Sequence, residues 1–236
     1  MPTVNNLHFV NQDKFSQALN SLVAEELEKR AGYKRGGHIF SPDHLTECDR
    51  RMVYRARDER PISQEVFVDY SNDAIRQKWI RLFQKCGFTR VIDDNSIVAD
   101  FNYNIQGVID LVLEFRYSED NDVILPVKIF PLRHEDYVCV QETAPFKKHL
   151  IDLMVNMWLI ELNNGILIYE DKNTNQYSIF HINQYAPIIN AVMKKCSRLL
   201  EFQINDRIPK RSYKNNTSRE CTVCEFKNTC WKQEEK

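Results

Sequence analysis

The chain has 236 residues, of which 43% are hydrophobic, and its formal net charge is −1. This composition predicts one main domain with a real core and excludes a low-complexity or repeat protein, and any nucleic-acid-binding surface must be local. The N-terminus lacks a basic segment followed by a long apolar one, and the most apolar helical segment, 150–162, carries charges. We therefore expect an intracellular protein that does not cross a membrane.

The first half of the chain changes from helical to strand periodicity near residue 88. Apolar residues recur at helical spacing over 11–31, 43–57 and 69–85. Ser41 and Pro42 predict the start of the second of these helices, as a cap followed by a first-turn proline. Short apolar runs then predict strands over 89–92, 96–101, 106–115 and 123–130, with a turn at 93–95.

The second half predicts a helix, two strands and a last helix. The first helix runs from 145 to about 162 and is expected to end at Asn163–Gly165. Strands follow over 166–170 and 177–182, then a helix over 185–205, and a tail without periodicity begins at Pro209. Helices, a mainly mixed sheet and a helix–strand–strand–helix unit together predict an α/β fold.

Two charges interrupt the strands that are expected to pair as a hairpin over 107–128. Asp110 breaks the first apolar run and Lys128 breaks the second. A charge in a buried strand is costly unless it is paired or bound to a metal, so these two residues mark a candidate site.

The seven cysteines predict a metal centre rather than a set of disulfides. Cys221, Cys224 and Cys230 fall within ten residues, and Cys48, in a basic helical segment, is the best candidate for a fourth ligand. Four thiolates suit an iron–sulfur cluster or structural zinc, and the separation of one ligand from three favours the cluster; free thiols in an unligated tail are the alternative. The remaining three are expected to be small buried hydrophobes: Cys86, Cys139 and Cys196.

Three segments carry a resemblance to a known family: SPDHLTECDRRMVYRAR, NNGILIYEDKNTNQYSIFHI and IPKRSYKNNTSRECTVCEFKNTCW. From Ser41 to Trp231 the chain resembles the RecB-like branch of the PD-(D/E)XK nuclease superfamily. Within this branch it is most similar to the iron–sulfur group of the CRISPR-associated exonuclease, its viral relatives and the AddB-type helicase–nucleases. The cysteine spacing is the most specific element of this resemblance.

The resemblance implies an architecture and a cofactor. It implies a restriction-endonuclease-like core with a central mixed sheet flanked by helices, and an iron–sulfur lobe that joins the N-terminal helical region to the C-terminal tail. The expected parts are a helical region over 1–87, the nuclease-like core over 88–205 and the cysteine tail over 206–236. Cys48, Cys221, Cys224 and Cys230 would hold a 4Fe–4S cluster, with zinc as the alternative.

The resemblance also implies a nuclease site from which several residues have been lost. Asp110 would be the metal-binding aspartate and Lys128 the motif lysine, but Pro126 stands in place of the motif acid and Arg76 in place of a histidine. The glutamine and tyrosine of the following helix fall on Asp152 and Asn156. Lys128 is then expected to pair with Asp110. Alternatively, Asp152 replaces the acid, and Asp110 and Asp152 bind Mg²⁺ or Mn²⁺.

Three functions remain open at this point. The favoured one is a catalytically impaired nuclease-like iron–sulfur protein that binds DNA or a protein partner in replication, recombination, transposition or defence. The others are an active DNA exonuclease or endonuclease that uses Asp152, and a protein-assembly subunit without DNA affinity. Basic residues beside the cysteines are the candidate DNA contacts: Arg50, Arg51, Arg55, Lys210, Arg211 and Lys214.

Overall fold

The computed structural model describes residues 40–57, 66–118 and 121–232, and the helix expected over 11–31 lies outside them. The strands are β1 (Thr89–Asp100), β2 (Ile105–Ser118), β3 (Asn121–Leu132), β4 (Asn164–Asp171) and β5 (Tyr177–Asn183). The helical elements are η1 (Pro42–His44), α2 (Asp49–Arg57), α3 (Val66–Lys85), α4 (His134–Glu142), α5 (Lys147–Leu159), α6 (Ala186–Ile204), α7 (Arg219–Thr222) and α8 (Lys227–Lys232).

The five strands form one mixed sheet in the order β1-β2-β3-β4-β5. Neighbouring strands are antiparallel except β3 and β4, which are parallel. A parallel pair needs a crossover connection, and α4 and α5 provide it between β3 and β4. The α/β prediction and the predicted hairpin are therefore confirmed.

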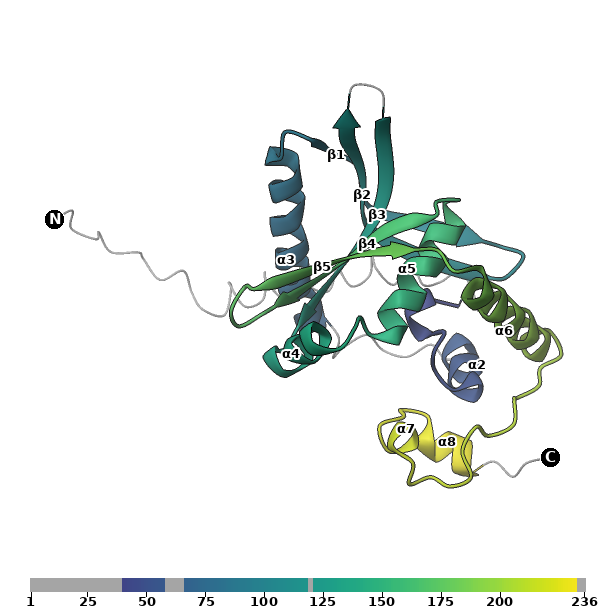
Figure 1. The fold of residues 1–236 in the computed structure, drawn as a ribbon. Helices are drawn as coiled ribbons and strands as arrows, with labels where there is room; N and C mark the ends of the chain where they lie inside the picture. The colour runs from purple at the N-terminus through teal and green to yellow at the C-terminus, as the bar shows by residue number, and fades with distance from the viewer. Residues whose placement is uncertain (1–39, 58–65, 119–120, 233–236) are drawn as a thin grey trace, which may run out of the picture.

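Helices cover both faces of the sheet (Figure 1). On one face, Trp79 and Ile80 of α3 pack against Leu111 of β2 and Ile129 of β3. On the other face, side chains of α4 and α5 pack against β3 and β4: Tyr137, Val140, Leu153, Met157, Leu132, Leu167 and Tyr169. Charged side chains inside this two-sided core therefore need partners within the protein.

A third apolar cluster joins η1, α2, α5 and α6 at one end of the sheet. It includes Met52 and Val53 of α2, Val155 of α5 and Leu199 of α6. Cys196 of α6 is fully buried in this cluster, as expected of a small hydrophobe, whereas Cys139 on α4 is exposed. The expectation that Cys139 is buried is therefore wrong, because α4 turns only part of its surface toward the sheet.

Two further predictions of local structure are wrong. Residues 89–101 form a single strand, because a bulge between Val91 and Asp93 and a positive φ of 53° at Asn95 accommodate the expected turn within the strand. The helix expected over 43–57 is split, because the carbonyl groups of Leu45 and Glu47 accept hydrogen bonds from Lys195 of α6, at 2.9 and 2.7 Å.

Candidate functional site

The candidate site lies where β2 and β3 separate. Their antiparallel pairing reaches Leu111 and Val127, and beyond this pair two side chains bridge the strands. The Oδ2 atom of Asp110 accepts a hydrogen bond from the backbone N–H of Ile129 at 2.7 Å. Nζ of Lys128 donates to the carbonyl of Val108 at 2.8 Å. Where the two strands no longer pair with each other, the side chains of Lys128 and Asp110 thus form hydrogen bonds with the carbonyl of Val108 and the N–H of Ile129.

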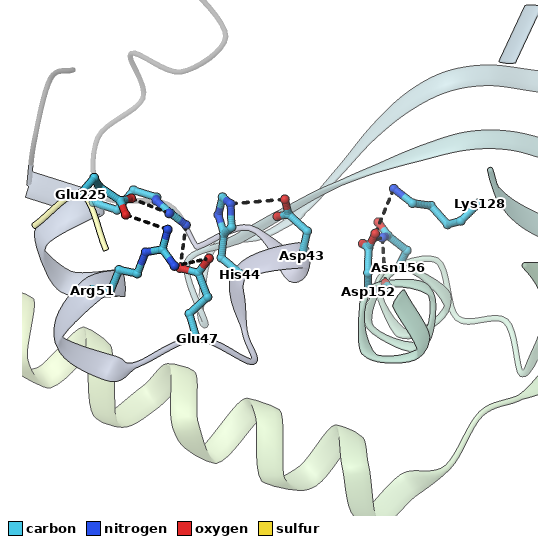
Figure 2. Close-up of polar contacts among 9 residues, drawn as sticks. Asp43, His44, Glu47, Arg51, Lys128, Asp152, Asn156 and Glu225 are labelled. Carbon is cyan, nitrogen blue, oxygen red and sulfur yellow. Dashed lines mark hydrogen bonds and ion pairs between the residues drawn. The ribbon is translucent and has the colours of Figure 1, made fainter. Parts of the chain in front are cut away.

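Lys128 forms its ion pair with the helix above the sheet rather than with Asp110. Its Nζ lies 3.2 Å from Oδ2 of Asp152 on α5, and both side chains are at least nine-tenths buried. Nδ2 of Asn156, one turn later, donates to Oδ1 of Asp152 at 2.8 Å and to its carbonyl at 2.9 Å (Figure 2). The expected Lys128–Asp110 ion pair is therefore corrected to Lys128–Asp152.

Asp110 is paired instead with Arg76, which the resemblance sets at the position of an expected histidine. Nε of Arg76 on α3 lies 3.0 Å from Oδ1 of Asp110, and Nη1 lies 3.1 Å from Oδ1 of Asp73. Both carboxylate oxygens of Asp110 are thereby engaged, one by a cation and the other by a backbone N–H. Arg76 places a positive charge at the position where a divalent cation would need a neutral or anionic ligand.

Burial and charge set the protonation of the Lys128–Asp152 pair. Burial raises the pKa of Asp152 to about 6, although Lys128 acts against this shift. Burial alone would lower the pKa of Lys128, but Asp152 and Asp110 outweigh it and raise that pKa. Near neutral pH the pair therefore consists of a protonated Lys128 and an ionised Asp152.

Pro126 is also buried, and its side chain supplies no third carboxylate to this site.

Within the described residues, no group of three His, Cys, Asp or Glu side chains is arranged to hold a metal ion. The two acids of the site, Asp110 and Asp152, each face a cation instead. A site of this composition lacks the several oxygen ligands that Mg²⁺ or Mn²⁺ requires.

A cleft of about 340 Å³ opens beside this site, between α3, α4 and the first turn of α5. Its walls include Arg76, Phe130, Lys148 and His149. The His149 ring stacks on Phe130 with centroids 3.7 Å apart, and its Nδ1 lies 3.1 Å from the hydroxyl of Tyr169. Burial lowers the pKa of His149 to about 3, so this ring is neutral at physiological pH. The lining of the cleft thus combines aromatic side chains with the cationic Arg76 and Lys148 and the acidic Asp136.

The sequence interpretation did not single out Lys148 and His149. Both belong to the segment FKKHL that begins the predicted helix, so a pair of lysines followed by a histidine was the available signal. Periodicity alone does not indicate that this turn faces the separated strands.

Gly107 on β2 lets α5 approach the sheet closely. A Cβ atom at this position would lie 2.1 Å from Oδ1 of Asn156, which is fully buried. We expect Gly107→Ala to lower the free energy of unfolding by about 1–3 kcal/mol, because Asn156 cannot move without losing its bonds to Asp152. Urea denaturation measures this loss. Gly87→Ala is the matched control, since no atom lies within 4 Å of its added methyl group; equal losses in the two variants would contradict the packing argument.

The four candidate cluster cysteines lie in a separate part of the molecule, which we call the cysteine lobe and define as Cys48, α2 and residues 209–232. The helices α7 and α8 of the tail lie beside α2 (Figure 1). Arg51 and Arg55 of α2 hold the two carboxylate oxygens of Glu225, at 2.6 and 2.7 Å, and Tyr54 stacks on Phe226 at 5.5 Å. The tail is therefore attached to α2 by charged and aromatic contacts.

The thiols of the cysteine lobe are half-buried. Sγ of Cys48 lies 3.2 Å from Oγ of Ser212, and both Cys48 and Cys221 act electrostatically on Tyr213, whose pKa is raised mainly by burial. Residues far apart in sequence thus meet here. In the described parts of the chain, however, no three of the thiols approach one another closely enough to define a metal site.

The candidate DNA contacts have different environments. Arg50 is 5% exposed, and Arg51 and Arg55 face Glu47 and Glu225, so burial and internal ion pairs argue against phosphate contacts by these three. The other candidates belong to the tail. Arg211 donates to the carbonyl of Cys230 at 3.0 Å, while Lys210 and Lys214 are exposed.

Comparison with known proteins identifies the fold. No protein-family model matches the chain, and no curated protein matches it. The crystal structure of SSO0001 matches with a TM-score of 0.57 and 18% identity, over 93% of this chain and 98% of that chain. The alkaline exonuclease LHK-Exo from Laribacter hongkongensis matches with a TM-score of 0.55 and 10% identity, over 72% of this chain and 89% of that chain. Its complex with dAMP matches with a TM-score of 0.53, 8% identity and the same shares.

These matches show that the chain shares its fold with solved structures that include an alkaline exonuclease. In the parts of the chain described, no helix is both long enough and apolar enough to cross a membrane.

Proposed function

We propose that this protein is a catalytically impaired nuclease-like iron–sulfur protein that binds DNA in replication, recombination, transposition or defence. The observation that carries the proposal is the Arg76–Asp110 contact of 3.0 Å. It places a guanidinium on the one acid that remains at the standard position, and Lys128 neutralises the nearby Asp152. A divalent cation would have to compete with both internal cations for these oxygens, without an acid at residue 126.

The cleft beside the site supports DNA binding without cleavage. Phe130 in its lining offers an aromatic contact for a base, and Lys148 offers a charge for a phosphate. Neither contact needs a metal ion. The cleft could therefore bind DNA even though the site lacks the ligands for a metal ion.

Lys148→Gln tests this binding role. We expect weaker binding to single-stranded DNA in fluorescence anisotropy, and a salt dependence of the binding constant whose slope is smaller by about one, because one phosphate contact is removed. Lys147→Gln removes the same charge from the neighbouring exposed residue, which does not line the cleft. Equal effects in the two variants would mean that only general surface charge attracts DNA. No DNA binding by the wild type would favour a protein-assembly role.

A second candidate function is metal-dependent DNA cleavage through Asp152. Its support is that Asp152 is 4% exposed and points at Lys128 inside the site rather than at solvent (Figure 2). Cleavage by this route requires Mg²⁺ or Mn²⁺ to displace the lysine from Asp152 and the arginine from Asp110. Mn²⁺-dependent cleavage that is lost in Asp110→Ala would select this candidate.

The iron–sulfur part of the proposal rests on the chemistry of the cysteine lobe. Cys48, Cys221, Cys224 and Cys230 supply four thiols on two segments that other contacts already hold together. A cluster bound there would add metal–sulfur bonds between α2 and the tail and so stabilise the fold. Iron and sulfide analysis of protein purified without oxygen tests this part, and zinc content tests the alternative metal.

A further inference from the structure

The two outer strands of the sheet differ in how their edges are protected. These strands are β1 and β5, and within the described residues each pairs with one neighbouring strand (Figure 1). An edge strand presents backbone N–H and C=O groups that can pair with another chain, and native proteins usually protect it with charges, bulges or irregular backbone. The strand β1 has all three: a bulge between Val91 and Asp93, a positive φ of 53° at Asn95, and charges at Arg90 and Asp100.

The strand β5 has none of these protections. Its seven residues, Tyr177–Asn183, pair with β4 without a shift in register, and none of them has a positive φ. No Lys, Arg, Asp or Glu occurs from residue 173 to residue 193, although these four types make up 28% of the chain. β5 is therefore a regular and uncharged edge, of the kind that accepts a further strand.

The hydrogen bonds beside β5 show which of its residues face away from β4. The N–H of Gln184 donates to the carbonyl of Asn163 at 2.7 Å, and the N–H of Asp171 donates to the carbonyl of Gln176 at 2.9 Å. In an antiparallel pair, residues that bond to the neighbouring strand alternate with residues whose backbone groups point the other way. The even-numbered residues of β5 therefore bond to β4. The odd-numbered residues, which we call the outward residues, point their backbone groups away from the sheet: Tyr177, Ile179, His181 and Asn183.

Side chains of the outward residues form an exposed apolar strip beside α3. Tyr177 packs edge-on against Trp79 of α3, with ring centroids 5.1 Å apart. Tyr177 is nevertheless 58% exposed, and Ile179 is 52% exposed. Their neighbours across the strand pair, Glu170 and Ile168 of β4, are fully buried. The buried layer under α3 thus ends between β4 and β5, and a sheet that continued past β5 would cover part of the exposed strip.

We propose that β5 pairs antiparallel with β5 of a second copy of this chain, about a two-fold axis at Phe180. In this register Tyr177 of each copy lies opposite Asn183 of the other, and Ile179 lies opposite His181. All four positions are outward residues, so each opposed pair can exchange backbone hydrogen bonds. The two five-stranded sheets then form one continuous sheet.

The partner is a second copy because the edge of β5 is complementary to itself. In a two-fold interface the same surface meets itself, so like charges on it are brought together and repel. The uncharged run of residues 173–193 avoids this repulsion, and the two Ile179 side chains lie diagonally across the axis. A two-fold axis in the middle of β1 would instead bring Asp93 and Asp94 of both copies together. This inference does not depend on the proposed function.

Ile179→Lys tests the pairing, because it places two lysines near each other across the axis. Analytical ultracentrifugation of the full-length wild type should give twice the 28.0 kDa mass of one chain. We expect Ile179→Lys to raise the dissociation constant of the dimer at least about 10-fold, through repulsion between like charges. Ile97→Lys is the matched control, since Ile97 is a 47% exposed isoleucine of the other edge strand, and it should dimerise like the wild type.

Amide hydrogen exchange measured by NMR locates the interface. The amides of the outward residues should exchange at least about 10-fold more slowly in the wild-type dimer than in monomeric Ile179→Lys. If Ile179→Lys does not fold, His181→Glu at another exposed outward position takes its place.

Three results would overturn the proposal. The first is a wild type that stays monomeric at the concentrations used for NMR. Slow exchange of the outward amides in such a monomer would mean that another segment of the same chain covers β5. The second is a dimer that folded Ile179→Lys leaves intact, and the third is a dimer that Ile97→Lys disrupts equally.

Discussion

Lys128→Met should lower the free energy of unfolding by about 3–5 kcal/mol at pH 7.5, because it leaves the buried carboxylate of Asp152 without a cation. Methionine keeps most of the side-chain volume, so the loss reports the ion pair with Asp152 and the hydrogen bond to the carbonyl of Val108 rather than packing. Chemical denaturation followed by circular dichroism measures it. Lys148→Met, which removes an exposed lysine from the same region, should cost less than about 1 kcal/mol.

Two further results follow from the same ion pair. Removing both charges in Lys128→Met with Asp152→Leu should restore much of the lost stability, because no buried charge then remains unpaired. In Lys128→Met alone, the loss should shrink as the pH falls from 8 to 5. Burial already raises the pKa of Asp152 to about 6, and without Lys128 this pKa rises further, so protonation neutralises the group. A loss that does not change with pH would contradict the assignment of Asp152 as the stranded charge.

Arg76→His combined with Pro126→Glu should create a divalent-cation site that the wild type lacks. The first change removes the guanidinium from Asp110 and supplies an imidazole, and the second adds a carboxylate two residues before Lys128. We expect the affinity for Mn²⁺ to rise by at least about 10- to 100-fold, because the ligand set then gains oxygen and nitrogen donors and loses a cation. Electron paramagnetic resonance titration measures free Mn²⁺ directly.

Arg76→His with Pro126→Gln is the matched control, since it has the same shape without the added carboxylate. It should bind Mn²⁺ more weakly than the glutamate variant. Wild-type protein that binds Mn²⁺ as tightly as the glutamate variant would show that the internal cations do not block the site.

Sequence patterns predicted the elements with strong periodicity. The helix α6 and the strands β4 and β5 were predicted to within a few residues, because their apolar spacing is regular. The helix α4 was missed because it buries only two side chains, Tyr137 and Val140, which is too few to produce a helical pattern.

The charges of the site could be predicted from the sequence, but their partners could not. Asp110 and Lys128 were identified because each interrupts an apolar strand. Their true partners, Arg76 and Asp152, come from helices on opposite faces of the sheet. Only tertiary packing places these side chains. Likewise, no periodicity indicates that Arg51 and Arg55 face Glu225 of the tail rather than DNA.

Cleavage of DNA by the purified wild-type protein, with Asp110→Ala as the reference, tests the central claim most directly. The assay uses end-labelled single- and double-stranded DNA with Mg²⁺ or Mn²⁺, at protein concentrations that give measurable binding. The proposed binding at the cleft predicts that DNA is bound, and the two internal ion pairs predict that no cleavage exceeds that of Asp110→Ala. Metal-dependent cleavage by the wild type that disappears in Asp110→Ala would contradict catalytic impairment and establish an active nuclease.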